Sequence, residues 1–248
     1  MLIVGLLAWG GIWLLGVIAA KLVDWVPTDV DVALGSQNWQ ALAPEESRCS
    51  NPGPLAYVEE LVQPLTEQAD GEFEFQFAVV DSEEVNAFAL PGGFVTVNMG
   101  LLEAAETGEE VAAVLAHEMT HVTHRHGMRA VLRRVGGLTV ISMIFGGTDF
   151  QNLAFAAEGL ATQAHSRDQE RDADEGGREL LMAAGVDPIG MATFFERMER
   201  DQGSLPGAAV LLSTHPNPGE RAETTREIAA GFTATRDLPD PPADLSCF

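Results

Sequence analysis

The chain has 248 residues, of which 46% are hydrophobic, and carries a formal net charge of −23 from 37 acidic and 14 basic residues. This length and hydrophobic content are sufficient for one domain with a buried core. The strong negative charge argues against a nucleic-acid partner, because phosphate binding requires a basic surface.

The N-terminal segment is apolar and long enough to cross a membrane. Residues 2–20 carry no charge, and about 20 apolar residues span a bilayer. We therefore expect a transmembrane anchor over residues 1–25, with Trp25 at the membrane interface. A cleaved signal peptide, which would leave a soluble exported form, is the alternative. Against it, the segment lacks a basic n-region, and its apolar run exceeds the usual length of about 7–15 residues.

Two cysteines flank the expected domain. Cys49 precedes it and Cys247 is the penultimate residue, and prolines mark both surroundings. A disulfide between them would tie the two ends of the domain together and would imply an oxidising compartment. Two unrelated thiols are the alternative. Lys21 weakly favours a cytoplasmic domain, but we give the cysteines more weight and expect the domain on the exported side, periplasmic or extracellular.

The first part of the folded chain is predicted to contain a small antiparallel sheet. A juxtamembrane segment, residues 26–54, shows little periodicity and is expected to be irregular. A helix should follow over residues 55–67. Alternating apolar residues then predict three strands, the last two separated by a Pro-Gly-Gly turn, over residues 73–77, 86–90 and 94–98.

Capping residues predict the helices that follow. Thr107 and Glu110 fit a capping box at the start of a helix that Gly127 can end. Ser166 fits the N-cap of another helix, which Gly185 stops. Helices are also expected over residues 149–164, 188–200 and 219–230, and an apolar stretch over 135–145 should pack beside the site or touch the membrane surface. The expected fold is α+β and mostly α, with a single domain over residues 55–236 and a tail over 237–248.

The first of these helices contains the segment His-Glu-Met-Thr-His, from His117 to His121. These two histidines are one helical turn apart on the same face, so their imidazoles can converge on one zinc ion. Glu118 can then act on water at the metal as a general base. The alternative is a helix that carries these residues by coincidence, because short motifs arise by chance.

A catalytic zinc ion usually has three protein ligands and one open position. Glu170 is the best candidate for the third ligand. Asp174, one turn later on the same face, can accept the N–H of a zinc-bound histidine and fix its orientation. The alternative for both is a solvated acidic helix face, which we expect for Asp168 and Asp172. Other histidines do not complete the pattern and are not expected to be ligands: His124, His126 and His165.

Four blocks, in this order, resemble the membrane-associated zinc metallopeptidases of the HtpX and CAAX prenyl protease type (peptidase family M48). The resemblance covers about residues 31–226. It implies a zincin-like domain that holds one zinc ion through His117, His121 and Glu170, with Glu118 as general base. The blocks are residues 86–93 (NAFALPGG), residues 115–121 (LAHEMTH), Ser166-Arg167 with Glu170, Ala173 and Asp174, and residues 214–218 (THPNP) with Glu220 and Arg221.

The same resemblance implies that His215 and Arg221 lie at the mouth of the site. Either side chain can stabilise the oxyanion of the tetrahedral intermediate, or His215 can occupy the open zinc position in a resting state. The first block is expected to lie beside an edge strand that pairs with the substrate backbone. An ordinary core hairpin is the alternative for that block. The candidate substrate-binding residues are Asn86, Ala87, Phe88, Gly92 and Gly93.

These patterns together predict a membrane-anchored zinc metalloendopeptidase. It would hydrolyse peptide bonds in proteins, with a role in membrane or envelope protein quality control by analogy with the family. Its partners would be protein or peptide substrates and, through the N-terminal segment, the membrane. The alternative is a non-proteolytic zinc-stabilised module that binds unfolded segments or a membrane partner. Glu118 argues against that alternative, because a purely structural site does not need this carboxylate.

Overall fold

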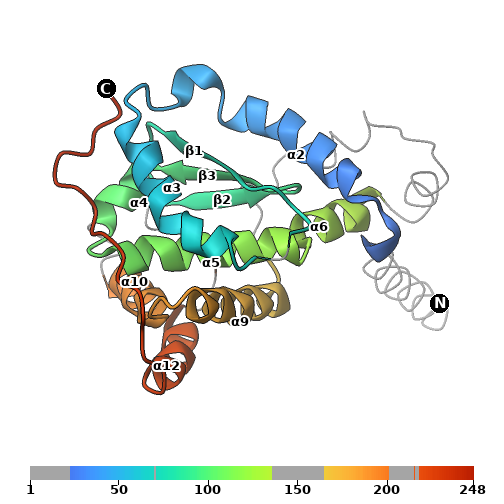
Figure 1. The fold of residues 1–248 in the computed structure, drawn as a ribbon. Coiled ribbons are helices and arrows are strands. Elements are labelled where there is room, and N and C mark those ends of the chain that lie inside the picture. Colours follow the sequence, from blue (N-terminus) through green and yellow to red (C-terminus); the bar gives the residue numbers. More distant parts are fainter. Residues whose placement is uncertain (1–22, 70, 136–164, 201–214, 216–217) are drawn as a thin grey trace, which may run out of the picture.

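The computed structural model describes residues 23–69, 71–135, 165–200, 215 and 218–248 of the chain (Figure 1). Residues 1–22, which make up most of the predicted anchor, lie outside the described ranges. The predicted helix over 149–164 and residues 136–145 of the predicted apolar stretch lie outside them as well. Within the described ranges, no helix is both long and apolar enough to span a bilayer.

The described chain is mostly helical, with one three-stranded sheet, as predicted (Figure 1). The predicted helices over residues 55–67, 166–184, 188–200 and 219–230 are confirmed, with bounds that differ by one or two residues. The helices are η1 (Val23–Trp25), α2 (Thr28–Leu42), η2 (Glu45–Ser47), α3 (Gly53–Thr66), α4 (Met99–Ala104), α5 (Gly108–Thr123), α6 (His126–Val135), α9 (Arg167–Ala183), α10 (Ile189–Arg200) and α12 (Pro218–Ala229).

The sheet is mixed, so the prediction of an antiparallel sheet is wrong for its first strand. The strands are β1 (Gln76–Val80), β2 (Ala87–Leu90) and β3 (Phe94–Asn98), in the order β1-β3-β2. A tight turn joins β2 to β3 as an antiparallel pair, whereas β1 runs parallel to β3. Parallel strands need a crossover of about a dozen residues. Residues 81–93, which include β2, provide that connection and place β2 on the far side of β3.

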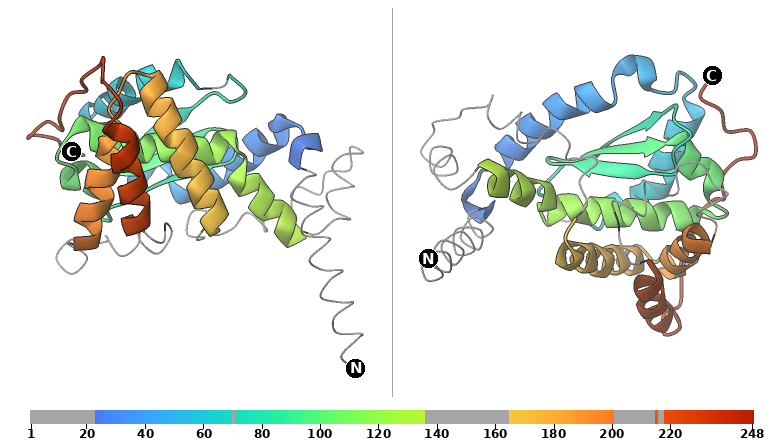
Figure 2. Two further views of the ribbon diagram at one scale, coloured as in Figure 1. Left: turned by 90° about the horizontal axis from the view of Figure 1, so that it is seen from below. Right: turned by 180° about the vertical axis from the view of Figure 1, so that it is seen from behind.

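Helix α5 lies between the sheet and a second layer of helices. It contacts β2 on one side and α9 and α10 on the other, and α12 packs against α10 (Figure 1). Viewed from below, α9, α10 and α12 lie side by side on this face (Figure 2). The central position of α5 explains why every residue from Glu110 to Val122 is buried.

The segment before the domain is helical, so the prediction of an irregular stretch over residues 26–54 is wrong for α2. This helix covers the sheet with Leu34 and Trp39, and the indole N–H of Trp39 donates a hydrogen bond to Oγ1 of Thr96 at 2.8 Å. Gly35 permits the close contact, because a Cβ atom there would lie 1.8 Å from the carbonyl oxygen of Pro91. Burial against the sheet stabilises a helix that its weak apolar periodicity does not indicate.

The end of α5 also differs from the prediction. The helix ends at Thr123, ahead of Gly127, and the chain bends at Arg125, which has a φ of 52°, before α6 begins (Figure 1). This left-handed backbone conformation is unfavourable for a non-glycine residue unless other contacts stabilise it. The Arg125 guanidinium supplies them by donating to the carbonyl oxygens of Val23 and Val26, both at 2.8 Å, and by pairing with buried Asp31.

The C-terminal tail packs along the domain and is linked to its beginning. Cys49 and Cys247 form a disulfide, as predicted. Beside it, the backbone N–H of Asn51 donates to the carbonyl oxygen of Cys247 at 3.0 Å. The Tyr57 hydroxyl donates to the carbonyl oxygen of Pro239, also at 3.0 Å. The tail therefore shares a core with α3 through the buried Cys247 side chain.

Replacement of Cys247 by Ala should lower the free energy of unfolding by about 2–5 kcal/mol, because the crosslink closes a long loop in the unfolded chain. Urea unfolding of the wild type and the variant, each with and without reductant, measures the effect. Reductant should destabilise the wild type and leave the variant unchanged. Equal stability of the oxidised wild type and the variant would contradict the prediction.

Candidate metal centre

The site begins with a helix whose start is encoded locally. The Thr107 hydroxyl accepts a hydrogen bond from the Glu110 backbone N–H at 3.3 Å, which caps α5. The Glu110 carboxylate accepts from the backbone N–H of Glu106, so the reciprocal half of the predicted capping box is not formed. From this capped start, about three helical turns carry the histidine pair to the buried middle of the domain.

Two glycines on α9 allow it to cross α5 closely. A Cβ atom at Gly177 would lie 3.1 Å from the backbone nitrogen of His117, and one at Gly176 would lie 2.6 Å from the Thr120 side chain. Ser166 and Gln169 form a complete capping box at the start of α9. The crossing and the cap together place Glu170 and Asp174 against the histidines. Sequence reasoning did not identify these glycines, although an adjacent pair inside a helix is a signal of close packing.

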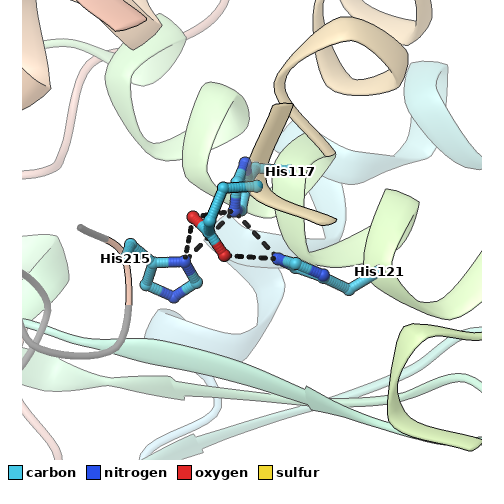
Figure 3. A group of neighbouring side chains, drawn as sticks. His117, His121 and His215 are labelled. Atoms are coloured by element: carbon cyan, nitrogen blue, oxygen red, sulfur yellow. Dashed lines mark hydrogen bonds and ion pairs between the residues drawn. The ribbon is translucent and has the colours of Figure 1, made fainter. Parts of the chain in front are cut away.

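The ligand candidates converge as four buried side chains: His117, His121, Glu170 and His215. Nε2 of His117 lies 3.0 Å from Nε2 of His121, and the Glu170 carboxylate oxygens lie 3.6 Å and 3.5 Å from these two nitrogens. Figure 3 shows the imidazoles of His117, His121 and His215 turned toward one another. The convergence brings together residues from α5, α9 and the segment before α12.

The spacing and chemistry of these atoms suit a divalent metal ion. A tetrahedral ion with bonds of about 2.0–2.1 Å separates its ligand atoms by roughly 3.3–3.4 Å, close to the separations in the cluster. Oε1 of Glu170 is buried and has no hydrogen-bond partner among the described residues. A buried polar atom without a partner is costly, and a cation among these side chains would satisfy it. Two imidazole nitrogens and a carboxylate therefore fit a metal centre.

His215 contributes a fourth nitrogen to the same cluster. Its Nδ1 lies 3.2 Å from Nε2 of His117 and 3.0 Å from Oε2 of Glu170. Its Nε2 faces Oε1 of Glu118 at 3.4 Å. Burial opposes protonation of His215, but its contact with Glu170 and the charge of Glu118 outweigh burial and raise its pKa. The structure thus places His215 among the ligand atoms rather than outside the cluster.

Asp174 and Arg221 support the cluster from behind. Oδ1 of Asp174 lies 3.0 Å from Nδ1 of His117, and the Arg221 guanidinium donates twice to the Asp174 carboxylate at 2.6 Å. Arg221 also lies 3.2 Å from Oε2 of Glu170 and stacks over the Phe195 ring at 4.2 Å. The guanidinium is therefore occupied within the protein.

The charge states of the two carboxylates follow from these contacts. Burial raises the pKa of Asp174, but the hydrogen bonds with His117 and Arg221 outweigh burial and lower it to about 2. Burial likewise opposes ionisation of Glu170, and the imidazoles of His121 and His215 outweigh it, so its pKa is lowered. Burial lowers the pKa of His117. Ionised carboxylates and a neutral imidazole are the forms that bind a metal ion.

Glu118 lies beside the cluster without joining the ligand atoms. Its Oε2 accepts a hydrogen bond from the backbone N–H of Ala89 at 3.0 Å, and its Oε1 is buried without a hydrogen-bond partner in the described part of the chain. This backbone contact places the outer edge of β2 next to the site. The carboxylate is thus held between the edge strand and His215.

The candidate substrate-binding block divides into two parts. Ala87 and Phe88 lie on β2, and Asn86 precedes the strand with its side-chain oxygen buried and unpartnered among the described residues. Gly92 and Gly93 adopt φ values of 85° and 101° in the turn after β2. Added Cβ atoms there would lie 2.5 Å from the Val32 backbone and 2.3 Å from the Glu74 carbonyl oxygen. Both positions therefore require glycine for a tight turn packed against the backbones of Val32 and Glu74.

Two histidines that were not expected to be ligands lie against the site. His126 is fully buried, and its Nδ1 lies 2.8 Å from Nδ1 of His121. The His165 ring stacks on the His121 ring with their centroids 3.9 Å apart. Burial lowers the pKa of His126 and of His165 to about 2 in each case. His126 begins α6 directly after the bend at Arg125, which brings its ring against His121.

Comparison with protein families matches residues 53–229 to the model described as "Peptidase family M48". The chain is 29% identical over 186 residues to the beta-barrel assembly-enhancing protease of Escherichia coli K12, a match that covers 70% of this chain and 38% of that protein. It is 32% identical over 158 residues to the metalloprotease LoiP of the same organism, covering 61% of each.

A eukaryotic relative is similar to the same extent. The mitochondrial metalloendopeptidase OMA1 of Schizosaccharomyces pombe is 31% identical over 171 residues, which cover 68% of this chain and 51% of that protein. The chain thus spans less than two thirds of the length of these relatives.

Replacement of Glu170 by Ala should remove tightly bound metal, because it deletes an ionised ligand. The loss of affinity should exceed the roughly 10–100-fold typical when only an outer hydrogen-bond partner of a ligand is removed. Asp168→Ala is the matched control, since Asp168 is exposed on the same helix and pairs with Arg171. Metal analysis of both purified variants after dialysis measures the effect, and full metal content in Glu170→Ala would exclude this ligand.

Proposed function

Because the chain belongs to peptidase family M48, we propose that it is a zinc-dependent metalloendopeptidase that hydrolyses peptide bonds in proteins. The proposal depends most on one observation. The candidate ligand atoms of two histidines and a glutamate lie within 4.8 Å of one another. Glu118 supplies a further carboxylate beside this cluster, facing His215. A zinc ion held only for stability would need no such carboxylate, so the arrangement favours catalysis over a structural zinc module.

The ligands in this proposal are Nε2 of His117, Nε2 of His121 and the Glu170 carboxylate. When bound, zinc acts as a Lewis acid that polarises the scissile carbonyl and stabilises the negative charge that develops on its oxygen. Asp174 accepts a hydrogen bond from the Nδ1–H of His117 at 3.0 Å. With the proton on Nδ1, the lone pair of Nε2 points into the cluster. Arg221 acts through Asp174 and Glu170 by keeping both carboxylates ionised, rather than on the substrate.

Glu118 is the proposed general base and then general acid. It would accept a proton from the attacking water and pass it to the nitrogen of the leaving amine as the C–N bond breaks. The hydrogen bond from Ala89 holds one of its oxygens, and the other faces His215. From this position the carboxylate would transfer a proton from the attacking water to the nitrogen of a peptide bond bound next to the cluster.

The substrate would bind in an extended conformation along the outer edge of β2. This strand pairs only with β3 among the described strands, and its Ala89 N–H points toward Glu118. An extended peptide paired with such an edge presents its carbonyl groups at regular spacing. Ala87 and Phe88 would contact it, whereas the turn glycines Gly92 and Gly93 would only shape the end of the strand.

His215 would act as a cap on the resting site. Its Nδ1 stands among the ligand atoms, at the fourth corner of the cluster. The alternative role as an oxyanion donor requires the ring to leave this position when substrate binds. The present geometry favours the cap, since Nδ1 lies among the candidate ligand atoms, 3.2 Å from Nε2 of His117.

The disulfide, the relatives and the N-terminal sequence indicate where the protein would act. The Cys49–Cys247 disulfide supports an oxidising, exported location for the domain. The name of one relative refers to beta-barrel assembly and that of another to mitochondria. We therefore propose membrane or envelope proteins as substrates, in a quality-control role. The uncharged residues 2–20 support a membrane anchor over residues 1–25.

Replacement of Glu118 by Gln should leave zinc content and thermal stability unchanged and lower turnover by about 10²–10⁴-fold, the usual contribution of general acid–base catalysis. Cleavage of casein or another unfolded protein, normalised to measured zinc, provides the comparison with the wild type. Unchanged turnover would contradict the peptidase mechanism and would restore the alternative of a zinc-stabilised binding module.

Replacement of His215 by Ala should raise peptidase activity if the ring caps the site at rest, because the fourth position becomes free. A fall of about 10²–10³-fold would instead identify His215 as an oxyanion donor. Steady-state cleavage of one peptide at several substrate concentrations separates the two outcomes. An unaltered rate would contradict both roles.

A further inference from the structure

His126 makes a contact with the proposed ligand set that the catalytic mechanism does not use. It is the first residue of α6, is fully buried, and places its Nδ1 2.8 Å from Nδ1 of His121. The ring is fixed in this place from several sides. Gln169 donates to the carbonyl oxygen of His126 at 3.3 Å, and the Arg125 guanidinium fixes the preceding bend by donating to the carbonyl oxygens of Val23 and Val26.

Two imidazole nitrogens at 2.8 Å share one proton, with one donating and the other accepting. We propose that His126 is a positioning residue for His121, with its Nδ1 accepting the Nδ1–H of His121. This inference rests on the proposed zinc site. With the proton on Nδ1, the lone pair of His121 Nε2 is available for the metal, and the hydrogen bond fixes the ring plane.

The two histidine ligands are therefore held by different chemistry. His117 donates to an ionised carboxylate, that of Asp174, whereas His121 donates to a neutral imidazole. A carboxylate increases the basicity of the ring that donates to it, and a neutral acceptor does so less. We infer that His126 contributes mainly orientation and tautomer selection, while Asp174 also contributes charge.

The position of the proton on the His126 ring follows from the same hydrogen bond. If Nδ1 accepts, a neutral ring must carry its proton on Nε2. That nitrogen is buried without a hydrogen-bond partner among the described residues, and Oδ2 of Asp172 lies 3.9 Å from it. A negative carboxylate at this distance favours the proton on Nε2. Asp172 is thus the electrostatic partner of His126, as Asp174 is the hydrogen-bond partner of His117.

This assignment argues against a second metal ion nearby. His124, His126 and Asp172 also bring their potential ligand atoms within 4.8 Å of one another, beside a pocket of about 580 Å³ that His124 and Asp172 help to line. A ring that carries its proton on Nε2 has no lone pair there for a metal. A metal on Nε2 would force Nδ1 to become the donor, and His121 would then lose the tautomer that binds zinc.

A matched pair of variants in the full-length protein tests the proposal. The amide oxygen of Asn can stand where Nδ1 of histidine stands, whereas Leu has the same branching without an acceptor. His126→Leu should weaken zinc binding by about 10–100-fold, as expected for the loss of a partner that orients a ligand. His126→Asn should stay within a few-fold of the wild type. His124→Asn, a change at an exposed neighbouring histidine, should have no effect.

Competition with a zinc chelator measures these affinities, and thermal unfolding of the metal-free proteins controls for stability. Nitrogen-15 NMR of the zinc-loaded wild type should show a proton on Nδ1 of His121 and on Nε2 of His126. Wild-type affinity in His126→Leu, or equal weakening in His126→Asn and His126→Leu, would overturn the role of the acceptor. Binding of a second zinc equivalent that His124→Asn abolishes would overturn the proton assignment. Failure of the wild type to bind zinc at His117 and His121 would instead refute the proposed function itself.

Discussion

The close crossing of α5 and α9 is the constraint on which the site depends. The histidine pair lies on one helix and the acidic pair on the other, so neither helix can form the cluster alone. Gly176 and Gly177 remove the side chains that would hold the helices apart. At this separation Asp174 reaches Nδ1 of His117 and Glu170 faces both imidazoles. The contacts of Arg221 with Asp174 and Glu170, and that of His215 with Glu170, depend on this crossing as well.

The buried carboxylates behind the site are paired with an arginine of the same chain. Burial of several ionised groups is unfavourable unless each group is paired. The Arg221 guanidinium lies against both Asp174 and Glu170, and Phe195 covers its outer face. One carboxylate oxygen of Glu118 and one of Glu170 nevertheless have no hydrogen-bond partner within the described ranges of the chain. These two atoms face the cluster, where a cation and a water molecule would complete their interactions in the proposed enzyme.

The sequence was most informative where local signals and function coincide. The histidine pair, the cap at Thr107 and the helix stop at Gly185 follow from spacing and local hydrogen bonds, so they could be read directly. Glu170 was already the best candidate for the third ligand, but only the family resemblance favoured it over a solvated acidic helix face, because no local rule specifies which acidic helix packs beside another. The disulfide was expected from the position of its cysteines at the two ends of the domain.

Features that depend on tertiary packing could not be read in the same way. The helical state of α2 comes from burial of Leu34 and Trp39 against the sheet, and its own periodicity is weak. The parallel pairing of β1 with β3 depends on how the chain crosses the sheet, which strand periodicity does not reveal. The burial of His126 depends on the unusual backbone at Arg125, which a distant segment stabilises.

X-ray diffraction from crystals of the zinc-loaded protein, collected on both sides of the zinc absorption edge, tests the central claim most directly. The account predicts a single anomalous peak per chain, bonded to Nε2 of His117, Nε2 of His121 and the Glu170 carboxylate, with Glu118 close to the ion but not bonded to it. A zinc ion bound elsewhere, or bound by Glu118 in place of Glu170, would contradict the account.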